Sequence, residues 1–154
     1  MDKLDHIGRK IIAALQSDGR ITVQELAEKV GLSASPCARR VRMMEDEGVI
    51  KGYSAVIDQA KIGLPMSAFA SIKLEKQRED HLDRFAKAIA DWPEVVDCYL
   101  MTGQYDYLMR IVVSDLASYE QFLKTKLTRL DGVSSIETSF ALGQTKRSEV
   151  LPVG

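Results

Sequence analysis

The chain has 154 residues, of which 28% are charged and 45% are hydrophobic, and its formal net charge is -1. This length suits one domain or two small ones, and no apolar run approaches the ~20 residues that a membrane span needs. Met1–Asp5 lacks the basic segment and apolar run of a secretory signal, so we expect a cytoplasmic protein with no membrane partner. Because the net charge is close to zero, any binding of nucleic acid must depend on where the charges lie.

Cys37 and Cys98 stand without a second cysteine or a nearby histidine at metal-ligand spacing. We expect both to be small core residues in a reducing compartment rather than a disulfide or a zinc site. His6 and His81 lie near predicted helix starts, and the chain lacks phosphate-loop, serine-hydrolase and zinc-protease motifs. We therefore predict a protein that is not an enzyme and that holds no cofactor and no metal.

The chain begins with two predicted helices. Apolar residues recur at helical spacing over 2–16, and Asp18–Gly19 ends that helix. Thr22 and Glu25 fit a capping box at the start of the second helix. Gly31 can take the left-handed conformation that stops it. The predicted buried face of this second helix is Val23, Leu26, Ala27 and Val30.

A third helix is predicted to begin with Ser33 as its N-cap. Pro36 falls in its first turn, where a missing N–H costs little. The predicted buried side is Cys37, Val41 and Met44, and the largely exposed arginines are Arg39, Arg40 and Arg42. Two short helices, a glycine turn and a basic outer face indicate a helix-turn-helix, with an ordinary helical hairpin and solvated arginines as the alternative.

The segment after Gly48 is predicted to be extended over 49–58, like the strand that leaves the DNA-binding part of a winged helix-turn-helix. The hinge is predicted at 58–65, where Gly63 and Pro65 interrupt the pattern. The predicted division is a helix-turn-helix domain at 1–52, a strand and hinge linker at 53–65, and a second domain at 66–154.

The second half repeats a strand–helix–strand pattern. Residues 66–74 alternate apolar and polar side chains as a strand does. The elements predicted after it are a helix at 82–89, strands at 95–102 and 106–113, a helix at 116–127 and a strand at 133–142. Two such units form a ferredoxin-like sheet with both helices on one face. The other face needs cover, and a homodimer that packs sheet on sheet is predicted to cover Phe69, Tyr99, Met101, Tyr107 and Met109.

The turn Gly103–Asp106 is either a plain hairpin turn or a loop that binds a ligand. Gly103 permits backbone N–H groups to approach a carboxylate closely. Asp106 can pair with an ammonium, so the turn suits a free amino acid, which carries both charges. The candidate walls of such a site are Leu100, Met101, Tyr105 and Tyr107.

Motifs that run in order along nearly the whole chain resemble the Lrp/AsnC, or feast/famine, regulators. They are Leu4–Asp5, Gly8–Ile12, Asp18–Ile21, Gly31–Ser33, Ser35–Cys37, Arg39–Val41, Glu47–Ile50 and Thr102–Leu108. The resemblance implies an α+β transcription regulator with an N-terminal winged helix-turn-helix and a C-terminal ferredoxin-like, RAM/ACT-like βαββαβ domain that senses an amino acid. It also implies a homodimer through the second domain that assembles into a tetramer or octamer. The glycine at Gly8 departs from the acidic residue that is frequent in the family.

The same resemblance implies that the third helix enters the major groove of a pseudo-palindromic operator in double-stranded DNA. The predicted DNA-binding residues are Ser33, Ser35, Pro36, Cys37, Arg39, Arg40 and Arg42. The predicted effector-binding residues are Leu100, Met101, Thr102, Gly103, Gln104, Tyr105, Asp106, Tyr107, Ile136, Glu137 and Thr138, the last three from a partner chain. If Glu137 faces the pocket, a polar or cationic effector is expected. If it faces solvent, the apolar walls favour leucine, methionine or a similar amino acid, which is the alternative we prefer.

Two other functions fit parts of this pattern. One is an architectural protein that wraps DNA without a ligand. The other is a small enzyme, or a regulatory subunit of one, that uses the ferredoxin-like half as a metabolite sensor. The arginines after Gly31 speak against the second alternative, and a thermal-shift screen of the amino acids separates the regulator from the architectural protein.

Overall fold

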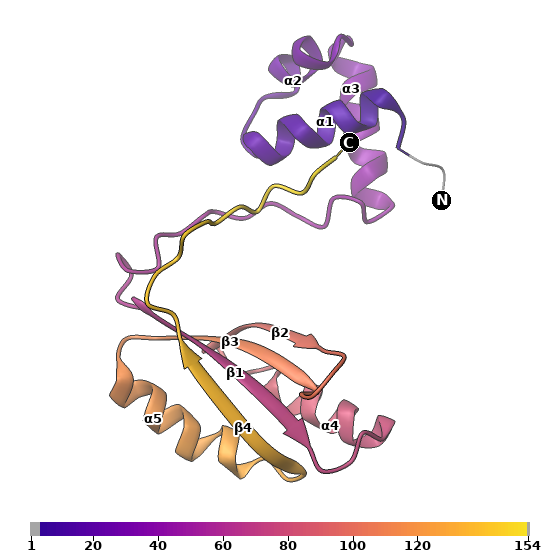
Figure 1. Ribbon diagram of the computed structural model, residues 1–154. Helices are drawn as coiled ribbons and strands as arrows, with labels where there is room; N and C mark the ends of the chain where they lie inside the picture. Colours follow the sequence, from indigo (N-terminus) through magenta and orange to yellow (C-terminus); the bar gives the residue numbers. More distant parts are fainter. Residues whose placement is uncertain (1–3, 154) are drawn as a thin grey trace. The chain divides into compact units, whose positions relative to one another are not determined.

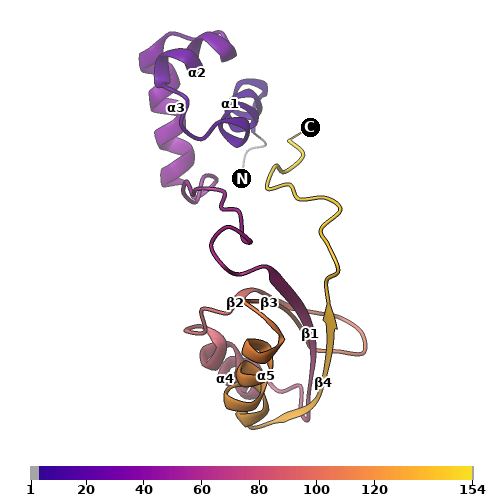
Figure 2. The ribbon, with the colours of Figure 1, turned by 90° about the vertical axis from the view of Figure 1, so that its left-hand side faces the viewer.

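The computed structural model describes residues 4–153 and divides into two compact units (Figures 1 and 2). The helical unit comprises Met1–Val56 together with Thr145–Gly154, and the sheet unit comprises Ile57–Gln144. The segment Thr145–Gly154, which the predicted division assigns to the second domain, thus groups with the helices of the first. The helical unit is therefore built from both ends of the chain.

Helix α1 spans His6–Ser17 and starts later than the pattern predicts. Asp5 keeps an extended backbone, and its carboxylate accepts a hydrogen bond from the Gly8 N–H at 2.7 Å, which caps the helix. The predicted start at Asp2 lies outside the described residues. Gly8 leaves room for this cap, because a β-carbon there would lie 3.1 Å from Oδ1 of Asp5.

Helix α2, Val23–Val30, confirms the predicted capping box. The Thr22 hydroxyl accepts the Glu25 N–H at 3.2 Å, and the Glu25 carboxylate accepts the Thr22 N–H at 2.9 Å. Gly31 ends the helix in the left-handed conformation, with φ 76°. Val23, predicted to be buried, is exposed because the core of the helical unit does not reach the first residue of α2.

Helix α3, Ala34–Asp46, has Ser33 at its N-cap position, but the Ser33 hydroxyl makes no capping hydrogen bond, which corrects the prediction. Its predicted inner side is confirmed, since Cys37 and Met44 are buried and Val41 packs against them. These side chains meet Ile11 and the buried residues of α2 in one apolar cluster. Burial of this shared face holds the three short helices together.

The segment that follows contains no β-strand, although a strand is predicted at 49–58. Its backbone is extended without a neighbouring strand among the described residues. The predicted hinge is a turn in which Oδ1 of Asp58 accepts the N–H groups of Ala60 and Lys61 at 3.0 and 3.2 Å. Gly63 completes this turn with φ 81°.

The sheet unit confirms the predicted α+β, ferredoxin-like fold. Its elements are β1 Met66–Leu74, α4 Glu79–Ile89, β2 Val95–Leu100, β3 Tyr107–Val113, α5 Leu116–Thr125, the short 3₁₀ helix η1 Leu127–Arg129 and β4 Val133–Phe140. The strand order is β2-β3-β1-β4, and all neighbouring strands are antiparallel. Helices α4 and α5 cover one face of the sheet, as Figure 1 shows, and the core lies between them and the sheet.

Strand register decides which side chains lie on the open face. Tyr107 lies opposite Ile72, and Met109 lies opposite Ala70. Residues directly opposite one another point to the same face of a sheet, and all four of these are buried under the helices. The predicted position of Tyr107 and Met109 on the open face is therefore wrong.

The open face does carry Phe69, Tyr99 and Leu108, from three adjacent strands. Phe69 is 37% exposed although it lies on a central strand, and Tyr99 is more exposed still. Arg110, opposite Phe69 in the register, makes an ion pair with Asp97 at 2.7 Å on the same face. The face without helices thus carries an apolar strip, formed by Phe69, Tyr99 and Leu108, beside the ion pair of Arg110 with Asp97.

Candidate functional site

The outer side of α3 carries most of the predicted DNA-contacting residues. The exposed members are Ser33, Ser35, Arg39 and Arg42, and the half-buried members are Pro36 and Arg40. Cys37 is the exception, because it is 0% exposed inside the core of the helical unit, where burial raises the pKa of its thiol. A side chain in that position does not reach a base, so the prediction that Cys37 contacts DNA is wrong.

Arg40 is already engaged within the helical unit. Its Nη1 lies 2.8 Å from Oδ2 and 3.1 Å from Oδ1 of Asp5. The Gly8 N–H and the Arg40 guanidinium hold the pKa of the Asp5 carboxyl below its usual range. One carboxylate therefore caps α1 and ties α3 to it. The Asp5-x-x-Gly8 spacing is a local capping signal, whereas the pairing of Asp5 with Arg40 joins residues 35 apart and has no sequence signal.

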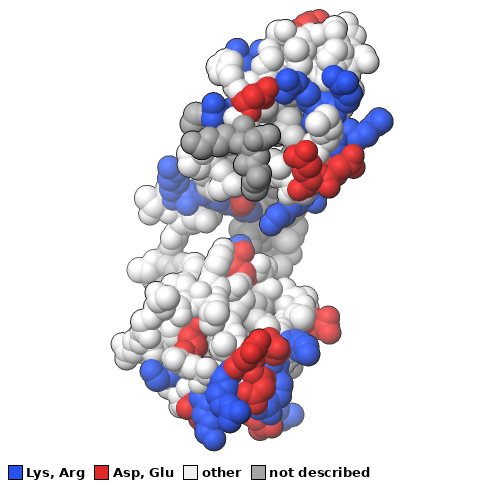
Figure 3. All heavy atoms as spheres, turned by 90° about the vertical axis from the view of Figure 1, so that its right-hand side faces the viewer, with Lys and Arg blue, Asp and Glu red and all other residues white. Residues whose placement is uncertain are grey.

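Arg39 and Arg42 differ from Arg40, because their side chains make no hydrogen bond or ion pair with any of residues 4–153. They lie three residues apart, which places them next to one another on the helix surface. No side chain caps the first turn of α3, so the N–H groups of Ala34 and Ser35 have no partner among residues 4–153 and suit a phosphate. Figure 3 shows basic side chains spread among acidic ones on one face of the molecule.

The second candidate site is the loop between β2 and β3. Leu100 ends β2, and Met101 lies just beyond it rather than on the sheet face, with both side chains exposed. Gly103 adopts φ 110° and has open space where a side chain would begin. The N–H groups of 102–105 make no hydrogen bond with any of residues 4–153. The loop therefore presents several free backbone donors beside two apolar side chains.

Asp106 does not present its carboxylate to this loop. It is 4% exposed, and its Oδ2 accepts the Leu74 N–H at 2.7 Å while its Oδ1 accepts a hydrogen bond from the Gln77 side chain. Its own N–H donates to the Ile72 carbonyl at 2.8 Å. The predicted direct contact of Asp106 with an ammonium is therefore wrong, because the carboxylate is buried and its two oxygens anchor the loop to the end of β1 and to the segment that follows β1.

Three further predicted effector-binding residues lie on the side of the sheet covered by helices. Tyr107 stacks on Phe85 with ring centroids 4.4 Å apart. Ile136 packs against the same core, and the Thr138 hydroxyl shares a hydrogen bond with the Tyr119 hydroxyl. Within one chain these side chains do not reach the loop, since the sheet separates them from its open face.

Glu137 lies between two such core-facing residues and points to the open face, as alternation along a strand requires. It accepts a hydrogen bond from the Tyr105 hydroxyl, and this contact raises the pKa of Tyr105. Lys73, on the same face, donates from Nζ to the Gln104 carbonyl at 2.8 Å. The loop is thus flanked by a carboxylate and an ammonium. Lys73 is not among the predicted site residues, because only the fold of the sheet places it beside the loop.

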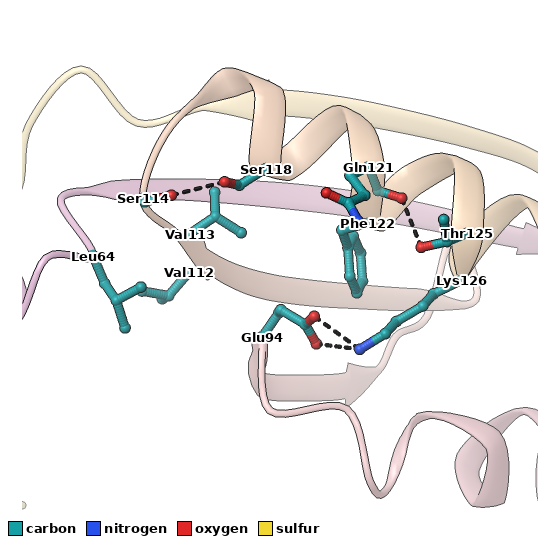
Figure 4. Close-up of a pocket in the computed structure, with 10 residues that line it drawn as sticks. All are labelled: Leu64, Glu94, Val112, Val113, Ser114, Ser118, Gln121, Phe122, Thr125 and Lys126. Atoms are coloured by element: carbon teal, nitrogen blue, oxygen red, sulfur yellow. Dashed lines mark hydrogen bonds and ion pairs between the residues drawn. The ribbon is translucent and has the colours of Figure 1, made fainter.

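A separate cavity of about 360 Å³ lies beside α5 (Figure 4). The Glu94 carboxylate and Nζ of Lys126 form an ion pair at 2.7 Å across one end of it. The hydroxyls of Ser114 and Ser118 bond to one another at 2.7 Å at the other end. Because the charged groups on its wall are paired with one another, this cavity suits a ligand with both charges less well than the loop does.

Among residues 4–153 there is no group of three or more His, Cys, Asp and Glu side chains that could hold a metal ion. No helix in that part of the chain is long and apolar enough to cross a bilayer. Cys98 is a free thiol, and burial raises its pKa to about 11, far from the range of a reactive cysteine.

Comparison with known proteins matches both units. The Lrp/AsnC ligand binding domain matches residues 67–151, and a winged helix-turn-helix DNA-binding domain matches residues 4–51. The chain is 49% identical over 142 residues to the Bkd operon transcriptional regulator of Pseudomonas aeruginosa, covering 92% of this chain and 93% of that protein. It is 41% identical over 144 residues to the leucine-responsive regulatory protein of Rhizobium meliloti, covering 94% and 92%. A Neisseria meningitidis transcriptional regulator in complex with L-Met superposes with a TM-score of 0.91 at 35% identity, covering 97% of each chain.

Proposed function

This chain belongs to the Lrp/AsnC family of transcription regulators, and we propose that the amino acid that controls it binds at the loop between β2 and β3. Membership makes the chain a DNA-binding transcription regulator whose action depends on a small amino acid.

We assign contact with double-stranded DNA to the exposed side of α3. Arg39 and Arg42 are the side chains available to reach guanine edges or phosphates. Ser33 and Ser35 flank the uncapped first turn, where backbone N–H groups favour a phosphate. Arg40 acts on DNA indirectly, by tying α3 to α1 through Asp5.

The proposed effector site matches the two charges of a free amino acid. The free N–H groups of 102–105 and the Lys73 ammonium suit the carboxylate, which needs several donors when it leaves water. Glu137, held beside the loop by Tyr105, suits the ammonium in place of Asp106. This single observation, a carboxylate and an ammonium on either side of a loop with free donors, carries the proposal.

The effector's side chain then meets Leu100 and Met101, which are exposed and apolar. Because Glu137 is used by the ammonium, no acidic group from this set remains for a cationic side chain. An apolar amino acid is therefore the proposed class, and methionine in particular packs adaptably against such surfaces. Two relatives are consistent with this class, one named as leucine-responsive and one solved with L-Met.

For the assembly we propose a homodimer that covers the open sheet face around Phe69, with further assembly into a tetramer or octamer. An exposed apolar strip on a central strand suits a second copy of the same face. Ile136 and Thr138 face the helices in every copy, so a dimer through the open face does not bring these two side chains to the loop. We place this assembly in the cytoplasm, where operator DNA is found.

A thermal-shift screen of the amino acids tests the proposed site, followed by titration of the best ligand into variants. We expect Glu137→Gln and Gly103→Val to weaken effector binding by roughly tenfold or more, because one loses the ammonium's partner and the other crowds the donors. Glu75→Gln is the matched control, since Glu75 is an exposed carboxylate of the same unit. DNA binding without effector should be unchanged in all three.

Two outcomes would contradict the proposal in different ways. If the best ligand bound both variants as tightly as wild-type protein, the effector site would lie elsewhere. If no amino acid stabilised the wild-type protein or changed its DNA affinity, the architectural alternative would replace the ligand-gated regulator.

A further inference from the structure

Tyr53 lies in the extended segment that follows α3, and its side chain reaches back to the helices. Its hydroxyl donates a hydrogen bond to Oε1 of Glu45, in the last turn of α3, at 2.9 Å. Its ring lies beside the turn between α1 and α2, since a β-carbon on Gly19 would be 3.6 Å from Cδ1 of Tyr53. All three residues belong to the helical unit. One side chain thus joins the segment after α3 both to α3 and to the turn after α1.

The backbone of this segment is tied to α3 only as far as Ile50. The Ile50 N–H donates to the Met44 carbonyl at 3.0 Å, and the Ile50 side chain packs against the apolar core. Within 51–56, the hydrogen bond of the Tyr53 hydroxyl is the only one made with any of residues 4–153. A groove of about 840 Å³ also lies between this segment and α1, so the two are not tightly packed. The direction in which the chain leaves the helices therefore depends on the Tyr53 side chain.

The chemistry of the two groups suits a lasting bond at neutral pH. Burial of the Tyr53 hydroxyl, followed by its hydrogen bond to Glu45, raises the pKa of Tyr53, so the hydroxyl keeps its proton and remains a donor. A hydrogen bond from a neutral donor to a carboxylate is stronger than one between two neutral groups. The bond to Glu45 can therefore restrain a segment whose backbone makes no hydrogen bonds of its own.

A restraint at the end of α3 affects how that helix is presented to DNA. Arg39 and Arg42, the side chains that we assign to DNA, lie on the same helix as Glu45. In the proposed dimer, each copy of α3 is joined to its sheet unit through segment 51–56. Both copies reach their half-sites at once only when the two segments leave their helices in suitable directions. A direction that is fixed before binding lowers the entropy lost on binding.

We infer that Tyr53 positions α3 for simultaneous recognition of two half-sites, by fixing the direction in which segment 51–56 leaves the helical unit. This inference rests on the proposed function, since it requires a dimer with two copies of α3. Tyr53 acts through Glu45 and is a positioning residue. Loss of its bond gives each helical unit more arrangements in the free dimer and weakens binding to a complete operator. A single half-site needs only one unit in place, so its affinity does not depend on this bond.

The experiment measures affinity for two DNA molecules, a complete operator selected from random DNA with wild-type protein and the same operator with one half-site scrambled. The variants are Tyr53→Phe, Glu45→Ala and the combination of both. Glu45→Gln keeps an acceptor oxygen and should behave as wild type. Glu47→Ala is the matched control, because Glu47 is an exposed carboxylate at the end of α3 whose side chain makes no hydrogen bond with any of residues 4–153.

The ratio of the two affinities separates positioning from a general loss of DNA binding. We expect this ratio to fall roughly 3- to 10-fold in Tyr53→Phe and in Glu45→Ala, close to what one hydrogen bond contributes. The combined variant should lose no more than the weaker single variant, because both changes remove the same bond. Affinity of Tyr53→Phe for the single half-site should equal that of wild type.

Cleavage by trypsin after Lys51 tests the restraint without DNA. Lys51 is exposed and lies two residues before Tyr53. We expect cleavage there to be several-fold faster in Tyr53→Phe than in wild type or Glu47→Ala, because cleavage follows how often the segment opens. Equal cleavage rates would show that the hydroxyl does not hold the segment.

The DNA measurements distinguish failure of this inference from failure of the proposed function. If Tyr53→Phe lowered both affinities by the same factor, or left their ratio unchanged, Tyr53 would have no positioning role while the dimeric regulator would stand. If wild-type protein bound the complete operator no more tightly than the single half-site, recognition by a dimer would be wrong and this inference would fail with it.

Discussion

At the scale of single residues, the three arginines of α3 are not equivalent. Arg40 is bound to Asp5, whereas Arg39 and Arg42 have no partner among residues 4–153. An arginine that already holds a carboxylate has fewer donors left for a base or phosphate. A cluster that looks uniform in sequence therefore divides into one arginine with an ion-pair partner and two arginines without a partner in the described part of the chain.

We expect Arg39→Ala and Arg42→Ala each to weaken operator binding, by roughly 1–3 kcal/mol where the arginine reads a base. An arginine that contacts only phosphate would instead weaken all sequences alike and reduce the salt dependence. Arg40→Ala should mainly lower the stability of the helical unit. Fluorescence anisotropy on operator and scrambled DNA at two salt concentrations, with urea unfolding of each variant, separates these effects. Normal stability of Arg40→Ala combined with the largest loss of DNA affinity would contradict the division.

Asp106 illustrates a second difference between residue type and residue role. We expect Asp106→Ala to destabilise the sheet unit by about 1–3 kcal/mol, because the Leu74 N–H loses its buried acceptor. Asp106→Asn is the matched control, since it keeps one acceptor oxygen and the Gln77 amide can rotate to meet the new donor. Urea unfolding measures both. If Asp106→Ala had wild-type stability but no longer bound the effector, Asp106 would have to contact the effector directly.

Local residue signals were predictable from sequence, and long-range partners were not. Thr22 with Glu25, and Gly31 after them, are found from spacing alone because capping depends on neighbours in the chain. Asp106 meets Leu74 and Gln77 across about thirty intervening residues, a contact that only the folded sheet creates. For this reason the turn was located correctly but the role of its carboxylate was not.

At the scale of elements, β3 shows why alternation can fail to predict a face. In β1 the small and branched residues alternate with Phe69 and Lys73, so its two faces are readable. In β3 the run Tyr107–Val113 is apolar on both sides except for Arg110. Alternate residues therefore do not differ in polarity, and the sequence does not indicate which side faces the core. Pairing with β1 then decides the face. The order of the four strands and of α4 and α5 in the sheet unit was predictable, but the side of the sheet on which Tyr107 and Met109 lie was not.

Strand β1 also provides a test of the proposed dimer. We expect Phe69→Asp to dissociate the assembly, because it places a charge in the middle of the apolar strip that a second copy would bury. Leu116→Asp is the control, since Leu116 is an exposed apolar residue in the first turn of α5, away from this strip. Sedimentation velocity at micromolar concentration gives the molecular mass. Circular dichroism must show both variants folded, and a Phe69→Asp protein of wild-type mass would exclude this face as the interface.

At the scale of the whole molecule, a symmetric dimer carries two copies of α3 and should therefore recognise two related half-sites. Their centres are expected about 10–10.5 base pairs apart or a multiple of this, so that both copies of α3 face the same side of the duplex. Inserting about five base pairs between the half-sites should weaken binding strongly, and inserting about ten should largely restore it. Equal affinity for all spacings in a binding assay would show that the two copies of the helical unit bind DNA independently.

Because the helical unit contains both ends of the chain, hybrid regulators cannot be built by a single exchange of N-terminal segments. Exchanging residues 1–56 between two relatives transfers the helices but leaves Thr145–Gly154 from the recipient. In that hybrid, the Gln16 side chain from one parent must hydrogen-bond to the backbone of Leu151 from the other. Residues 1–56 alone therefore do not transfer the complete helical unit. A single crossover near the linker separates two segments that fold together, and a working graft needs a second junction after Gln144.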